Sequence, residues 1–136
     1  AYIAPVEGTA NGVIVVDGAM AGIGITENPI TLEVRDGLVT RILGGPAARQ
    51  LEDLIAPLGA PARNIAELGI GTNDRARLTG RVLEDEKVMG TIHLAIGDNS
   101  HFGGKVAVPS HLDGIILSPT LVIDGKSVMV NGELVS

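Results

Sequence analysis

Cysteine and aromatic residues are nearly missing from this chain of 136 residues. It contains no Cys and no Trp, and only one Tyr and one Phe. Without cysteine, neither disulfides nor thiolate metal sites can form. Since apolar residues still make up 45% of the sequence, the core must be built from Val, Ile, Leu and Ala. The 19 glycines indicate many turns between short elements.

Positive charge is also scarce, and long apolar runs are missing. The chain has 10 Lys and Arg against 16 Asp and Glu, which gives a formal net charge of −6. We expect no nucleic-acid partner, because phosphate binding requires a basic surface. No apolar run has the length of a membrane span, and neither a basic amphipathic helix nor a signal peptide is visible. These features predict a protein that does not bind membranes, and they are compatible with a cytoplasmic location.

Short strands separated by turn dipeptides account for most of the sequence. In residues 30–45, apolar and polar residues alternate on both sides of an Asp-Gly pair, which is typical of a β-hairpin. A similar region with Asp-Gly and Asn-Gly turns covers residues 120–136. Helical spacing of apolar residues after a proline predicts one main helix at about 46–58. The pattern favours an α+β fold of mostly antiparallel sheet, barrel-like or strongly curved.

Two of the three histidines, His93 and His111, lie in segments that are expected to be strands and are candidates for metal chemistry, whereas His101 is expected to be a residue of the glycine-rich loop between them. His111 and Asp113 are two residues apart, so both side chains would project from one face of a strand. An imidazole beside a carboxylate can hold a divalent metal, although the pair can also form a hydrogen bond on a solvated strand. His93 is surrounded by apolar residues. It is either a core histidine or a second imidazole of the same site.

Acidic residues complete the candidate site. Glu67 lies between Ala66 and Leu68, where a buried carboxylate would need a partner; on an alternating strand it could instead face water. Residues 84–86 form an acidic run. Such runs are usually solvated, but next to a bound cation Glu86 could act as a general base. The sequence contains no complete phosphate-binding glycine motif and no nucleophile elbow.

Several segments together resemble a known family. In order along the chain, "NIAELGIGTN", "LEDEKVMGTIHLAIGDNS" and "HLDGI" are similar to the C-terminal half of the thermophilic metallo-aminopeptidases, the aminopeptidase T and aminopeptidase S family. The resemblance implies a cytoplasmic, dimeric exopeptidase with two domains and two divalent metals: zinc, cobalt or manganese. It places the metal ligands at Glu67, His93, His111 and Asp113. The tyrosine typical of the family corresponds to Ser100, which puts peptidase activity in doubt.

The resemblance predicts that residues 1–136 form a single domain, the C-terminal metal-binding domain of an aminopeptidase-like hydrolase. A further Glu ligand of the family falls just before residue 1, so we expect a fragment that lacks an N-terminal domain. Such a fragment would be homodimeric and inactive on peptides by itself, with Glu86 as the proton-moving carboxylate of the intact enzyme. Related ring-cleaving dihydroxypyridine dioxygenases use iron, and a mononuclear-iron oxygenase is therefore the alternative. A non-catalytic dimerisation module is a further alternative.

Overall fold

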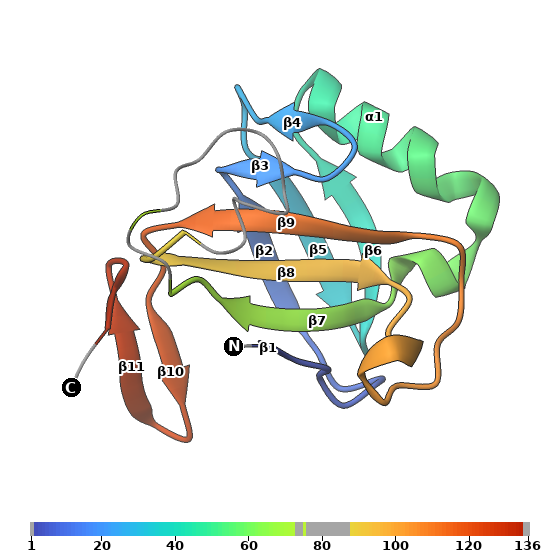
Figure 1. Ribbon diagram of the computed structural model, residues 1–136. Coiled ribbons are helices and arrows are strands. Elements are labelled where there is room, and N and C mark those ends of the chain that lie inside the picture. Colours follow the sequence, from blue (N-terminus) through green and yellow to red (C-terminus); the bar gives the residue numbers. More distant parts are fainter. Residues whose placement is uncertain (1, 73–74, 76–87, 135–136) are drawn as a thin grey trace.

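Antiparallel β-sheets form most of the protein in the computed structural model, which describes residues 2–72, 75 and 88–134 (Figure 1). The larger sheet has the strand order β1 (Tyr2–Ile3), β7 (Ile65–Ile70), β8 (Thr91–Gly97), β9 (His111–Leu117), β3 (Ala19–Met20) and β4 (Gly24–Ile25). The second sheet has the order β2 (Gly12–Val16), β5 (Ile30–Arg35) and β6 (Leu38–Leu43). The third is a small sheet of β10 (Leu121–Ile123), β11 (Lys126–Val130) and β12 (Glu133–Leu134).

The predicted fold class is confirmed. The sheets are antiparallel and curved, with one main helix, α1 (Pro46–Ile55), beside β6 (Figure 1). Short 3₁₀ helices cover Ala56–Leu58, Ala60–Arg63 and Ser100–Phe102. In the described part of the chain the larger sheet does not close into a barrel, because β1 and β4 remain its edges. Within the same ranges, no helix has the length and apolarity needed to cross a membrane.

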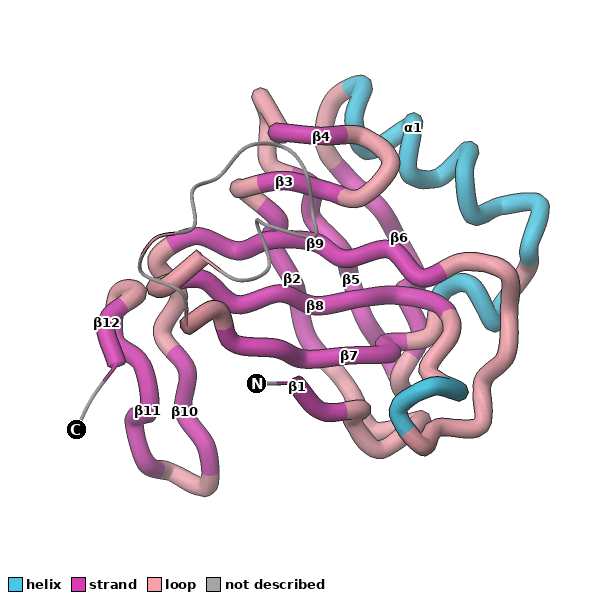
Figure 2. The backbone as a smooth tube through the Cα atoms, in the orientation of Figure 1, coloured by secondary structure: helices cyan, strands magenta, loops and turns pink. Residues whose placement is uncertain are grey.

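The predicted hairpins form with the turns that the sequence favours. Asp36 and Gly37 join β5 to β6 with positive φ angles of 50° and 81°, as a two-residue hairpin turn requires. The Asp-Gly and Asn-Gly pairs of the small sheet also have positive φ at both residues. This small sheet projects from one end of the larger sheet (Figure 2).

Helix α1 follows its predicted bounds. Pro46 begins it, and the 3₁₀ turn that continues it to Leu58 ends at Gly59, whose φ is 76°. Leu51 is fully buried, whereas Leu54, which the apolar spacing also suggests for the inner face, is 47% exposed. The helix therefore presents a narrower apolar stripe to the core than its sequence indicates.

An aliphatic core fills the space between the two main sheets, whose strands cross steeply in Figure 1. The second sheet contributes Ile30 and Leu32, and the larger sheet contributes Ile96 with the partly buried Leu94. Because side chains alternate along a strand, the odd-numbered residues of β8 lie on the face of the larger sheet opposite to that of Leu94 and Ile96. His93 is one of these residues.

Truncation of Leu51 tests the core. We expect Leu51→Ala to lower the free energy of unfolding by about 2–5 kcal/mol, because it leaves a cavity at a fully buried position. Leu54→Ala, the same change one turn on at an exposed position, should cost about 1 kcal/mol or less. Urea unfolding followed by circular dichroism measures both. Equal losses would contradict the burial of α1 described above.

Candidate metal centre

Three neighbouring strands bring the four predicted ligands together on the face of the larger sheet that points away from the aliphatic core. Glu67 on β7 and Asp113 on β9 lie in one cross-strand row, with the small side chain of Ala95 on β8 between them. His93 lies one row away, opposite Gly69, and His111 lies opposite Gly97 on the other side. The small residues leave room on this face for larger polar groups.

A β-bulge turns Glu67 to this face. Ile65 pairs with Ile96 and Glu67 pairs with Ala95, so two steps along β7 match one step along β8. In a regular strand, Ile65 and Glu67 would point the same way. The extra residue, Ala66, instead sends Ile65 into the core and Glu67 to the opposite side. The alternative that Glu67 faces water is wrong, because it is only 5% exposed.

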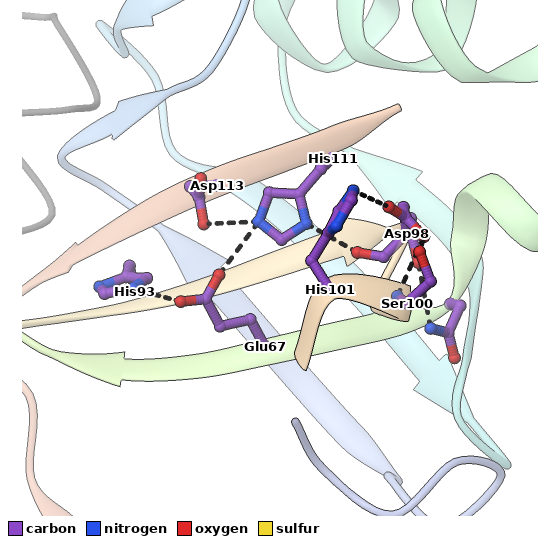
Figure 3. A network of polar contacts seen from close by, with 9 residues as sticks. Glu67, His93, Asp98, Ser100, His101, His111 and Asp113 are labelled. Atoms are coloured by element: carbon purple, nitrogen blue, oxygen red, sulfur yellow. Dashed lines mark hydrogen bonds and ion pairs between the residues drawn. The ribbon is translucent and has the colours of Figure 1, made fainter. Parts of the chain in front are cut away.

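The carboxylate of Glu67 lies between two imidazole rings (Figure 3). Its Oε1 is 3.2 Å from Nε2 of His93, and its Oε2 is 3.0 Å from Nε2 of His111. Nε2 of His111 is also 3.4 Å from Oδ1 of Asp113. Ligand atoms of Glu67, His111 and Asp113 all lie within 4.8 Å of one another, the spacing of a set that can hold a metal ion. His93 contacts Glu67 but is not part of this group of three.

A backbone carbonyl fixes the ring of His111. Nδ1 of His111 donates to the carbonyl oxygen of Asp98 over 2.8 Å, which directs Nε2 to the two carboxylates. Metal-binding histidines commonly have such a partner on their second nitrogen. Asp98 follows Gly97, which has a φ of 113° and where a Cβ would lie 2.2 Å from the carbonyl oxygen of Ser110. Only glycine fits this bend, which carries Asp98 over the His111 ring.

Charge at the site favours a cation. Contact with the Asp113 carboxylate raises the pKa of His111 to about 9, the Asp98 carbonyl and the Glu67 charge add to the effect, and partial burial opposes it. A protonated His111 between two carboxylates leaves one uncompensated negative charge. A divalent ion in place of the proton would leave none. Within the described residues, the buried Oδ1 of Asp113 has no regular hydrogen bond, and its polar neighbour is Nε2 of His111 at 3.4 Å. The donor set therefore fits a divalent metal.

The loop after β8 supports the site from one side. The carboxylate of Asp98 accepts hydrogen bonds from the backbone N–H and the hydroxyl of Ser100, and the hydroxyl contact is the main reason that the pKa of Asp98 lies below its usual value. His101 is exposed and lies 3.7 Å from the same carboxylate, as expected for a loop residue. The buried Asn99 holds the loop to Glu7.

One residue that the sequence suggested for the site cannot be placed, and one contribution to the site was not foreseen from the sequence. Glu86, the predicted catalytic carboxylate, lies outside the described residues. The contribution of Asp98 was missed, because it acts through a backbone carbonyl that every residue type has. Gly97, the glycine that ends the strand before Asp98, was the sequence signal of an unusual bend at this point.

Comparison with known proteins identifies the family. The sequence pattern of 2,5-dihydroxypyridine 5,6-dioxygenases matches residues 1–136, the entire chain. The chain belongs to this family. It is 31% identical over 117 residues to the 2,5-dihydroxypyridine 5,6-dioxygenase of Pseudomonas putida strain KT2440, a match that covers 79% of this chain and 33% of that protein. A solved structure of the dihydroxypyridine dioxygenase from the same strain superposes with a TM-score of 0.91 at 27% identity. That match covers 99% of this chain and 43% of the other.

This family membership corrects the main functional prediction. The expected zinc or cobalt aminopeptidase, a hydrolase that removes N-terminal residues from peptides, is wrong, and the alternative, a dioxygenase domain, is the reading that the match favours. The segments that suggested an aminopeptidase include β7, β8 and the start of β9, which carry the candidate ligands. Carboxylates and imidazoles on a shared scaffold can serve hydrolysis or oxygen chemistry, so they did not specify the reaction.

Titration of His111 tests the electrostatics of the metal-free site. We expect its pKa to be about 9, and we expect Asp113→Asn to move it toward the ordinary value of 6.5 by removing the largest cause of the shift. Because folding raises this pKa, the linked stabilisation is full below pH 6.5 and is lost as the pH rises through 9. NMR of the imidazole resonances measures the titration, with His101→Ala to assign the exposed ring. An unchanged pKa in the Asn variant would contradict this arrangement.

Proposed function

We propose that this chain provides the metal centre of a ring-cleaving dioxygenase that acts on 2,5-dihydroxypyridine or a close analogue. In this proposal Glu67, His111 and Asp113 hold a single ferrous ion. The observation that carries it is the approach of these three buried or partly buried side chains to within 4.8 Å of one another. They occupy a domain whose whole length matches the dioxygenase family.

The donor set supports iron as the ion. One imidazole and two carboxylates form a mixed nitrogen and oxygen set, close to the two-His, one-carboxylate set of many non-haem iron oxygenases. Two carboxylates and a neutral imidazole balance a divalent ion without residual charge. With three protein ligands, ferrous iron keeps open positions and supplies the dioxygen chemistry that ring cleavage requires.

In this proposal, the contribution of the surrounding residues is to hold the three ligand side chains in position. The Asp98 carbonyl holds His111 in the tautomer that carries its proton on Nδ1, so that Nε2 can bind a cation after its own proton leaves. Glu67 and Asp113 come from strands whose other face is locked into the aliphatic core, which keeps the carboxylates at a fixed separation.

The chain spans about a third of the length of its curated relative and 43% of the chain in the solved structure. The activity of the complete relative is therefore a proposal for this chain. The predicted additional domain and the predicted homodimer remain predictions.

Removal of one ligand tests this proposal. The complete protein, loaded anaerobically with ferrous iron and then exposed to air, should consume 2,5-dihydroxypyridine and dioxygen together. Asp113→Ala should reduce this rate by more than the roughly 100-fold that the loss of an outer-shell partner costs. Asp53→Ala removes an exposed carboxylate from α1 and should leave the rate unchanged.

Absorbance of the pyridine and an oxygen electrode follow the two reactants. A wild-type protein that binds iron but consumes neither reactant would contradict the proposed function. Undiminished turnover by Asp113→Ala would contradict the assignment of the ligand.

A further inference from the structure

We propose that His93 is a positioning residue that holds Glu67 in a one-oxygen binding mode and is not itself a metal ligand. The inference rests on the metal centre proposed above. It gives His93 a role different from the fourth ligand that the sequence suggests.

The contact between His93 and Glu67 uses the ring nitrogen that a metal would need. Nε2 of His93 lies 3.2 Å from Oε1 of Glu67, and both residues are 5% exposed. An ionised carboxylate only accepts hydrogen bonds, so Nε2 must carry a hydrogen and donate it. Nε2 of His111 also contacts a Glu67 oxygen, but it lies 3.4 Å from Asp113 as well and belongs to the group of three, whereas Nε2 of His93 contacts Glu67 and lies outside that group. In its contact, Nε2 of His93 is a donor to Glu67.

The other ring nitrogen points away from the candidate ligands. Figure 3 shows the Glu67 carboxylate between the His93 ring and the His111 ring. With Nε2 turned to Glu67, Nδ1 faces the other way. It is buried and has no hydrogen-bond partner within the described part of the chain. His93 therefore has no nitrogen free on the side of His111 and Asp113.

Gly69 provides the space for the ring. It lies opposite His93 in the β7–β8 ladder, and a Cβ at this position would be 2.1 Å from both Cε1 and Nε2 of the ring. Gly69 does not have a positive φ, so glycine is needed here for space and not for backbone conformation. The packing of the ring against this backbone sets its distance from Glu67.

This arrangement determines how Glu67 meets a cation. With Oε1 of Glu67 held by Nε2 of His93, Oε2 is the oxygen that lies beside Nε2 of His111. A carboxylate free to use both oxygens would take an additional coordination position. By holding Oε1, His93 keeps that position available for small ligands.

Four variants of the complete protein test this role by anaerobic titration of the metal-free form with Co²⁺, followed by visible absorption. His93→Leu removes the donor and should weaken Co²⁺ binding about 10- to 100-fold, as for other outer-shell partners. His93→Gln keeps a side-chain N–H at similar reach and should restore most of the affinity. Gly69→Ala displaces the ring without altering a polar group and should match His93→Leu. Asp113→Ala should abolish binding.

The spectrum and the double variant separate positioning from ligation. His93→Gln should keep the wild-type Co²⁺ absorption bands, because the ligands are unchanged. Gly69→Ala should cause no further loss in a His93→Leu background, because both changes act through the same contact. Thermal unfolding checks that each variant folds. If His93→Leu does not fold, His93→Gln and Gly69→Ala still give opposite expected results.

Three outcomes would overturn the inference. These are a His93→Gln variant that binds as poorly as Asp113→Ala with shifted bands, a His93→Leu variant with wild-type affinity, and a wild-type protein that does not bind Co²⁺. The proposed function fails separately: a protein that gives the expected Co²⁺ results but does not cleave dihydroxypyridine with iron would refute the dioxygenase proposal alone.

Discussion

A carboxylate buried between two imidazole rings is the constraint on which the rest of the site depends. Glu67 is almost completely shielded from water, and an ionised carboxylate in such a place is costly unless its oxygens have partners. His93 takes one oxygen and His111 takes the other. The bulge at Ala66 is what makes this possible, because a regular β7 would send Glu67 into the aliphatic core with Ile65.

The fold supports this polar cluster through a division between the two faces of one sheet. On one face, β7, β8 and β9 pack with aliphatic side chains against the second sheet, and no tryptophan or cysteine is needed for that core. On the other face, Gly69, Ala95 and Gly97 leave space between the polar groups. Because the strands are fixed by the core and by the ladder, the polar groups are held in place before any ligand binds.

The sequence predicted those features that depend on local pattern. The turns at Asp36 and Gly37, the helix from Pro46 and the shared face of His111 and Asp113 all follow from spacing or from the conformations that single residues allow. The bulge could not be predicted in this way, since a single unpaired residue is defined by the partner strand and not by its own sequence. For the same reason, the sequence could place His93 near the site, as a core histidine or a ligand, but could not show that its ring contacts Glu67.

The reaction was the least predictable feature, and the ligand set explains why. Carboxylates and an imidazole balance the charge of a divalent ion whether the ion activates water or dioxygen. The candidate ligands therefore carry little information about the reaction. The contacts that restrict which of their atoms are available carry more information. These are the Asp98 carbonyl that fixes the tautomer of His111 and the His93 N–H that occupies one oxygen of Glu67. In the proposed centre, such contacts would set how many coordination positions stay open to substrates. They depend on the backbone bend at Gly97 and on the space that Gly69 leaves for the His93 ring. Both become visible only when the strands are placed side by side.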